Sequence, residues 1–358
     1  MKKKGEAAAS AMTETQLVTT ITKRKRISYA KYGYIFSIPF VIAYLIFAFY
    51  PTIYTAIIGF TNLQGPGKTS WSFLGLSDLF SNYKTVLTMP TFHIALKNTV
   101  KLWVCNFIPQ MIMALLLAAW FTNTRVKIPG QGAFKVLFYM PNIITAATVA
   151  ILFNTLFGYP MGPVNDLLVR LKLIEPGNEI YFLASKKAAQ NIVIFIQTWM
   201  WYGYTMIIII SGVLGIDPEI FEAADIDGAN GWQVFWKITI PSIRTIMLFT
   251  LVTSLIGGLN MFDIPLNLVP NSGPDNSTLT TSVLIYQLAF KGRCFYNRAS
   301  AMSMVMFIII VTVSAILFFS MRDKDEVRLE KLRKADAKAK KAEMKLAAKE
   351  AKGVKNGK

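Results

Sequence analysis

Six apolar stretches, each long enough to cross a lipid bilayer, dominate this chain of 358 residues. A helix needs about 20 mostly apolar residues to cross a hydrocarbon layer roughly 30 Å thick. Because 53% of the residues are hydrophobic and only 16% are charged, a soluble globular fold is excluded. The sequence predicts an all-α, polytopic membrane protein with six transmembrane helices, at about Tyr34–Phe60, Ile94–Phe121, Phe134–Phe157, Ala188–Leu214, Thr245–Leu266 and Ala299–Met321.

Prolines and cysteines add two constraints. Proline lacks a backbone N–H and clashes with the preceding turn, so the prolines inside the predicted helices should kink or interrupt them; they are Pro39, Pro51, Pro109 and Pro141. Membrane helices tolerate such breaks where neighbouring helices cover the freed carbonyl groups. The two cysteines fall in an apolar stretch and in a loop, so neither a disulfide framework nor a zinc site is expected.

The positive charge lies mostly in two basic tails. The formal net charge is +18, which would first suggest a nucleic-acid partner. Basic segments beside membrane helices are more simply explained as cytoplasmic anchors, so the predicted partner is the lipid bilayer and not nucleic acid. With both termini in the cytoplasm, the cytoplasmic segments hold 27 of the 38 Lys and Arg residues. The predicted regions are a basic N-terminal tail at 1–33, a six-helix domain at 34–321 and a Lys- and Ala-rich tail at 322–358.

One polar segment, at about 217–241, separates the fourth and fifth apolar stretches and lies in the cytoplasm in this orientation. Asp217 followed by a proline and an acid predicts the start of a short helix, because these residue types suit the cap, the first position and the positive end of the helix dipole. Gly228 should end this helix in a left-handed conformation. A second short helix is predicted at about Gly231–Ile238, before Pro241 opens the fifth stretch.

The same segment has a surface suited to a partner protein. Ala223 and Ala224 are small enough for another chain to approach closely. Larger apolar residues lie around them, and a six-helix protein need not bury these itself: Phe221, Ile226, Trp232, Val234 and Phe235. Burying each of them would contribute roughly 1.5–3 kcal/mol, so a few such contacts could transmit a partner's movement into the fifth helix. The alternative is an ordinary amphipathic loop on the inner membrane face.

The spacing within this segment resembles a known motif. Glu222-Ala223-Ala224-Asp225-Ile226-Asp227-Gly228, followed after nine residues by Ile238-Thr239-Ile240-Pro241, resembles the EAA motif, EAA-x3-G-x9-I-x-L-P, of importer permeases driven by ATP-binding-cassette (ABC) subunits. Ile240 conservatively replaces the leucine. The resemblance implies that this loop contacts an ATPase, through Phe221, Glu222, Ala223, Ala224, Asp227, Gly228, Ile238 and Pro241.

Weaker signatures are similar to the maltose-type branch of these permeases, over roughly Tyr34 to Arg322. They occur in the family's order: Phe73-Leu74-Gly75-Leu76, Asn82-Tyr83, Phe92 with Ala95-Leu96-Lys97-Asn98-Thr99, then Gly162, Asn165, Leu167 and Leu168, then Asn260-Met261-Phe262-Asp263 and Ser272-Gly273-Pro274. The chain departs from the pattern at Ser272, where the family has glycine, and by some four extra residues between Leu76 and Asn82.

This resemblance implies a type I ABC importer permease fold and a transport subunit that is not itself an enzyme. The expected partners are two ABC ATPase subunits, a second homologous permease and an extracytoplasmic solute-binding protein. ATP and Mg would be used by the ATPase, so no cofactor is expected in this chain. The implied location is the bacterial cytoplasmic (inner) membrane, and the implied cargo is a sugar, of oligosaccharide size, moved by alternating access.

A sugar in a membrane cavity needs neutral polar partners and flat aromatic faces, because ionisable groups are costly at that depth. The run Trp199–Tyr204 places an aromatic cluster within the fourth stretch. The resemblance implies substrate-binding roles for Tyr204, Ser254, Trp201, Asn260 and Met200, while Gly258 stands where the family has a pocket amide. Packing between helices is the alternative for each of these side chains.

Other transport functions stay open at this point. The same machinery could carry glycerol phosphate or a polyol, although an anionic cargo would favour cationic pocket residues. An ion-coupled carrier or a channel would need acids at mid-membrane, whereas Asp263 lies near an outer helix end.

Overall fold

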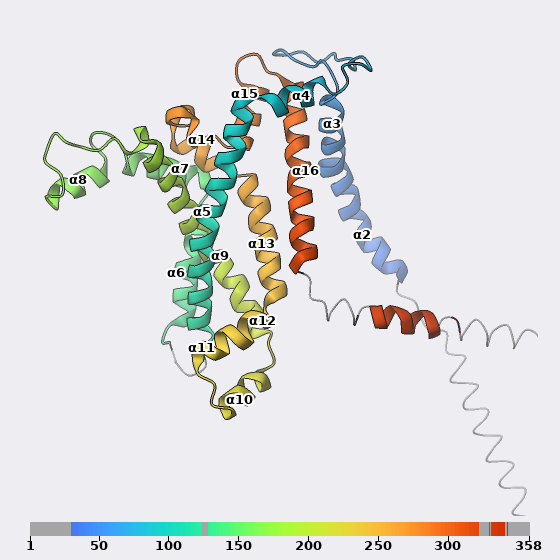
Figure 1. The fold of residues 1–358 in the computed structure, drawn as a ribbon, viewed down its shortest axis with the longest axis vertical. Coiled ribbons are helices and arrows are strands. Elements are labelled where there is room, and N and C mark those ends of the chain that lie inside the picture. Colours follow the sequence, from blue (N-terminus) through green and yellow to red (C-terminus); the bar gives the residue numbers. More distant parts are fainter. Residues whose placement is uncertain (1–29, 124–127, 322–328, 330, 341, 343–358) are drawn as a thin grey trace, which may run out of the picture. The chain divides into compact units, whose positions relative to one another are not determined.

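A computed structural model describes residues 30–123, 128–321, 329, 331–340 and 342 of the chain (Figure 1). Apart from one isolated bridge between Thr61 and Phe73, the regular structure in these residues is helical. The chain divides into two compact units, Met1–Thr55 and Ala56–Lys358. The predicted N-terminal tail lies almost wholly outside the described residues, as does much of the predicted C-terminal tail, in which residues 331–340 are helical and exposed.

The described residues hold five helices that are long and apolar enough to cross a membrane, and a sixth candidate span is a bent pair. The first, Lys31–Ile58, combines α2 (Ala30–Tyr44), the π-helical η1 (Leu45–Phe49) and α3 (Tyr50–Ile58). The others are α5 (Pro90–Phe121), α9 (Lys186–Leu214), α13 (Arg244–Leu259) continued by α14 (Asp263–Leu268), and α16 (Tyr296–Met321). The predicted all-helical membrane fold is confirmed.

The third predicted stretch differs from a single straight crossing. It forms α6 (Gln131–Ile143) and α7 (Ala146–Leu156), which meet at 88°. Pro141 removes a backbone donor from the last turn of α6, Ile144 and Thr145 are extended, and the Thr145 hydroxyl accepts the Thr148 N–H to start α7. A proline near a capping threonine therefore breaks this span, whereas Pro109 lies inside the single helix α5.

α9 lies at the centre of the unit formed by Ala56–Lys358. It packs along α5 and against α6, α13 and α14, and 61% of its most apolar window is buried, compared with 11% for α16. One hydrophobic cluster joins its first half to α5 and α7 through Leu102, Val149 and Ile196. Because α16 is covered so little within this chain, much of its surface is available to lipid or to other helices.

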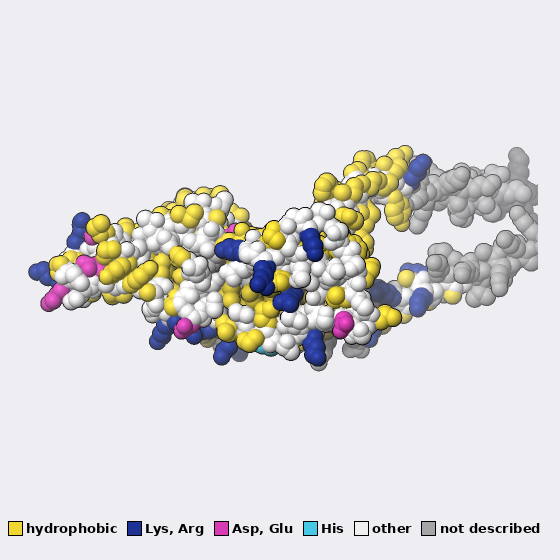
Figure 2. Space-filling model, turned by 90° about the horizontal axis from the view of Figure 1, so that it is seen from above, with side chains coloured by type: hydrophobic (Ala, Val, Ile, Leu, Met, Phe, Trp, Pro, Cys, Tyr) yellow, Lys and Arg dark blue, Asp and Glu magenta, His cyan; other side chains and the backbone are white. Residues whose placement is uncertain are grey.

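Short helices lie at both ends of this unit. α10 (Pro218–Ile226) and α11 (Gly231–Gln233) lie at one end, which we call the α10 end, and α4 (Ser81–Thr88) and α15 (Thr281–Phe290) lie at the opposite end (Figure 1). The segment between α7 and α9 holds α8 (Pro163–Arg170) and η2 (Phe182–Ala184). Figure 2 views the end opposite α10, where Lys and Arg side chains are scattered among polar and apolar ones.

Candidate functional site: a coupling loop and a membrane cavity

The loop between α9 and α13 begins with the helix that the sequence predicts. The Asp217 carboxylate accepts the Glu219 N–H at 3.1 Å, which caps α10, and Pro218 is its first residue. Gly228 follows with a φ of +73°, a left-handed conformation that suits glycine. The predicted start and end of this helix are therefore confirmed.

The second predicted helix, at about Gly231–Ile238, is present but is mostly wound as a π-helix. Asn230 and Gln233 form a reciprocal capping box with two hydrogen bonds of 2.9 Å, which starts α11. The π-helical η3 (Val234–Thr239) and α12 (Ile240–Ser242) follow. The Ile240 N–H reaches the Phe235 carbonyl, five residues back, next to Pro241, which has no N–H of its own. The chain then enters α13.

The predicted coupling residues divide into an anchored group and an exposed group. Ala224 is buried in its own chain, and half-buried Phe221 packs against the hydrophobic cluster that contains Val213 and Ile243. This cluster holds α10 against the ends of α9 and α13. Of the predicted coupling residues, those exposed are Glu222, Ala223, Asp227, Gly228 and Pro241, while Ile238 is half-buried. Ile226 and Trp232 are exposed as well. Of the two alanines, only Ala223 therefore offers a surface to another chain.

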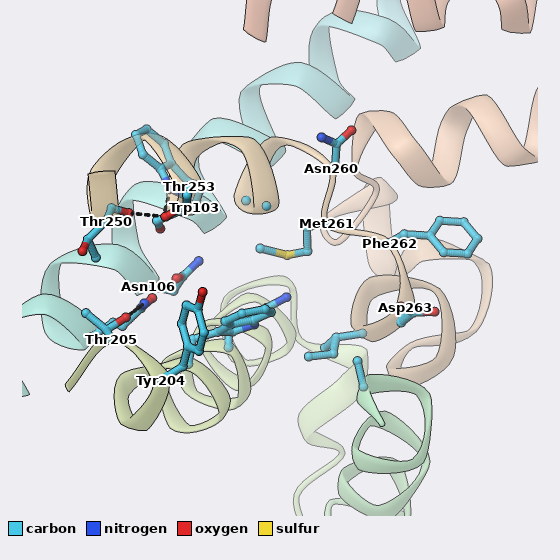
Figure 3. Close-up of a pocket in the computed structure, with 18 residues that line it drawn as sticks. Trp103, Asn106, Tyr204, Thr205, Thr250, Thr253, Asn260, Met261, Phe262 and Asp263 are labelled. Atoms are coloured by element: carbon cyan, nitrogen blue, oxygen red, sulfur yellow. Dashed lines mark hydrogen bonds between the residues drawn. The ribbon is translucent and has the colours of Figure 1, made fainter. Parts of the chain in front are cut away.

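A cavity of about 270 Å³ lies between α5, α9, α13 and the break before α14 (Figure 3). At the α10 end, α9 ends at Leu214 and α13 begins at Arg244. At about 1.5 Å of rise per residue, Tyr204 and Ser254 each lie about 15 Å along the helix from these termini. That distance corresponds to the middle of a bilayer. The lining residues are Trp103, Asn106, Gln110, Ala146, Gln197, Trp201, Tyr204, Thr205, Thr250, Thr253, Ser254, Gly257, Gly258, Asn260, Met261, Phe262, Asp263 and Ile264.

The chemistry of this lining is aromatic and mostly neutral. Among the described residues that line the cavity, Asp263 is the one charged residue. The Gln110 amide donates to the Thr205 hydroxyl at 2.7 Å, and the Trp103 indole N–H donates to the Ser254 hydroxyl at 3.3 Å. Four aromatic residues, together with several amides and hydroxyls, can thus meet a neutral, hydroxyl-rich solute, as pocket chemistry requires.

The structure brings four of the five predicted substrate-binding residues to this cavity. Trp201 and Tyr204 lie edge to face with ring centroids 5.8 Å apart, and Ser254 and Asn260 approach from α13 and its end. Met200 does not line the cavity. Its side chain is 4% exposed and is held in the hydrophobic cluster with Ile196 and other core residues, because α7 and the 261–269 segment cover that side of α9.

Three lining residues on α5 are not among those predicted. Trp103, Asn106 and Gln110 follow a spacing of three and four residues, which places them on one face of the helix. Asn106 and Gln110 are buried polar residues in an apolar span, and a polar stripe of this kind is a signal that the sequence offers. The amides need partners in the membrane, so the stripe faces other helices or a cavity.

A bundle of apolar helices around a mid-depth cavity, with a capped helical loop at one end, defines a membrane transport protein. Residues 85–324 match the family described as "Binding-protein-dependent transport system inner membrane component". The chain belongs to this family. It is thus the permease subunit of an ABC importer, a multi-pass inner-membrane protein and a transport component rather than an enzyme.

Sequence relatives cover most of the chain. The lactose transport system permease protein LacF of Rhizobium radiobacter is 31% identical over 309 residues, covering 86% of this chain and all of LacF. The arabinooligosaccharides transport system permease protein AraP of Bacillus subtilis (strain 168) is 32% identical over 287 residues, covering 79% of this chain and 86% of AraP.

Solved structures show the same fold. A chain of a bacterial ABC transporter that imports the acidic polysaccharide alginate matches with a TM-score of 0.68 and 25% identity, covering 86% of this chain and 98% of that chain. A chain of the alginate transporter in complex with an alginate pentasaccharide-bound periplasmic protein matches with a TM-score of 0.68 and 24% identity, covering 83% and 98%. The fold is that of a type I ABC importer permease.

Proposed function

We propose that this permease moves a neutral oligosaccharide from an extracytoplasmic binding protein into the cytoplasm by alternating access. The observation that carries the proposal is the aromatic, mostly neutral lining of the mid-depth cavity. Relatives named for the transport of lactose and arabinooligosaccharides support a carbohydrate cargo. Tyr204, Trp201, Ser254 and Asn260 are the proposed substrate contacts.

A neutral cargo fits the cavity better than an anionic one. None of the described residues that line it is Lys or Arg, and Asp263 would repel a phosphate or a uronate. Glycerol phosphate is therefore a poor candidate, and an acidic sugar such as the alginate of the structural relative would need cations from another chain. An ion-coupled carrier would need a second acid or a partner for Asp263 within the cavity, and the lining offers neither.

The proposed machine needs four kinds of chain. Two ATPase subunits that use ATP and Mg would dock on the exposed part of the α10 loop, and Phe221 would transmit their movement into α9 and α13 through the cluster described above. A second homologous permease would complete the cavity, and a solute-binding protein would deliver the sugar at the end opposite α10. This arrangement requires both termini and the α10 loop to be cytoplasmic.

Affinity purification of the tagged chain from its native membrane, followed by mass spectrometry, tests this assembly. We expect a second six-span permease and an ABC ATPase to co-purify under gentle detergent. Relatives are named for the transport of lactose, arabinooligosaccharides and diacetylchitobiose, and uptake of these sugars by the reconstituted complex, supplied with its binding protein, then tests the cargo. Recovery of the chain alone or as a homo-oligomer, with no ATPase, would contradict the proposal.

A further inference from the structure

The indole of Trp103 occupies the space that a side chain at position 258 would need. A Cβ atom built on Gly258 would lie 2.6 Å from Trp103 Cγ and 3.0 Å from Trp103 Cβ, with Cδ1 closer still. Non-bonded atoms do not approach a Cβ this closely, so an indole in this place requires glycine at 258. Trp103 and a side chain at 258 exclude each other.

Both residues of this pair line the cavity (Figure 3). Gly258 presents no side chain to the cavity. The structure fills that place with an aromatic ring from α5, a helix far away in the sequence. This part of the cavity wall therefore offers aromatic contact.

A hydrogen bond holds the Trp103 indole in place and orients the hydroxyl group of Ser254. The Trp103 Nε1–H donates to Ser254 Oγ at 3.3 Å. Because an indole nitrogen only donates, the serine oxygen is the acceptor, and its own hydroxyl proton is left to donate to another oxygen. Trp103 thus presents a ring and orients a hydroxyl donor at the same wall of the cavity.

We propose that Trp103 is a specificity-determining residue that contacts the apolar C–H face of a sugar ring, with Ser254 donating to a sugar oxygen beside it. Gly258 contributes to this contact because, having no side chain, it leaves room for the Trp103 indole. This proposal rests on the proposed function and names the saccharide surface that this wall of the cavity recognises. Aromatic rings and convergent polar groups are the usual components of such pockets.

The same helix provides a matched control residue. Trp120 is also on α5, is 46% exposed and does not line the cavity. Gly132, near the start of α6, has no atom within 4 Å of a built Cβ and does not line the cavity either. Trp120→Ala and Gly132→Ala therefore repeat the two chemical changes away from the cavity.

The test is a double-mutant cycle on the full importer complex in proteoliposomes, with its binding protein and whichever of lactose, arabinotriose and diacetylchitobiose the wild type takes up fastest. We expect Trp103→Ala and Gly258→Ala each to lower sugar uptake about tenfold, the scale of one aromatic contact. The double variant should also lose about tenfold rather than about a hundredfold, because both changes remove the same contact. Trp103→Phe should keep most of the uptake.

ATP hydrolysis stimulated by the binding protein separates sugar contact from loss of folding or assembly. It should stay within about twofold of wild type in every assembled variant, and the two control variants should transport normally. Unchanged uptake in Trp103→Ala, or a multiplicative loss in the double variant, would overturn the assignment of Trp103 and leave the proposed function standing. A wild-type complex that assembles but takes up none of the three sugars would contradict the proposed function, and the Trp103 assignment with it.

Discussion

At two glycines, Gly203 and Gly258, an added Cβ would clash with a neighbouring helix. A Cβ built on Gly203 of α9 would lie 2.7 Å from the Phe138 carbonyl carbon and 2.9 Å from Tyr139 Cα. The obstacle is the backbone of α6, which cannot rotate away as a side chain can. At Gly258 the obstacle is the side chain of Trp103. Small residues at helix contacts are the usual means of close packing in membranes, where no water drives the helices together.

Gly203→Ala should therefore lower the stability of the folded permease. Forcing α6 away from α9 is an overpacking change, with a typical cost of about 1–3 kcal/mol. Thermal unfolding of the detergent-solubilised chain measures it, and we expect a lower Tm. Gly132→Ala is the control, since its Cβ meets no atom within 4 Å, and it should not lower the Tm. Equal Tm values for Gly203→Ala and wild type would show that α6 can shift without cost.

Tyr204 supplies the residue-scale prediction for the cargo. The side chain is half-buried, lines the cavity and meets Trp201 edge to face. Tyr204→Ala should slow uptake while the complex still assembles, and Tyr204→Phe separates the ring from its hydroxyl group. Uptake by proteoliposomes and gel filtration of the complex measure the two effects. Transport unchanged for every sugar tested would remove Tyr204 from the proposed contacts.

At the scale of single elements, the α10 loop is held firmly at its base and open at its tip. Its two helices are capped by Asp217 and by the Asn230–Gln233 pair, and Phe221 holds the first against the bundle. Gly228 lies between them, exposed and left-handed, with open space around a built Cβ. A loop that is anchored at its base and exposed at its tip is suited to transmit movement from a bound partner.

Gly228→Asp should abolish uptake with little effect on folding. A Cβ atom at this position meets no atom of the described residues within 4 Å, and the added carboxylate would place charge at the proposed ATPase contact. Co-purification of the ATPase and sugar uptake measure the loss, and circular dichroism checks the helices. Gly228→Asn is the matched control, because Asn has the same shape without charge and also tolerates left-handed backbone. Normal uptake with Gly228→Asp would count heavily against the coupling role of this loop.

The sequence predicts the elements that depend on neighbouring residues and misses those that depend on contacts between distant helices. The bounds of α10 depend on a cap and a glycine, which are local, and the sequence locates both. The 88° angle between α6 and α7 depends on contacts with other elements, because α6 packs against α9 and α7 packs against α14. The proline alone therefore does not predict the angle. The π-helical winding of Val234–Thr239 likewise has no simple signature in the sequence.

At the scale of the whole molecule, the sequence likewise predicts only some of the residues that line the cavity. The aromatic run Trp199–Tyr204 and the family resemblance together predict Trp201 and Tyr204, and these two of the four rings in the run line the cavity. The sequence does not predict Trp103 as a cavity residue, because its proposed contact with the sugar depends on the absence of a side chain at Gly258, in a different helix. Met200 does not line the cavity, for the opposite reason: other elements bury the side of α9 on which it lies. Pairings between distant helices decide both outcomes.

The assembled importer should draw its energy from ATP and not from an ion gradient. In proteoliposomes that enclose ATP, dissipating the proton and sodium gradients with ionophores should leave sugar uptake unchanged, because the cavity lining holds a single acid and offers no relay of charged groups. Omitting the enclosed ATP should abolish uptake, and so should leaving out the ATPase subunits. An ion-coupled carrier predicts the reverse on every count. Uptake that continues without ATP and collapses with the gradients would therefore replace the importer mechanism with a carrier mechanism built on Asp263.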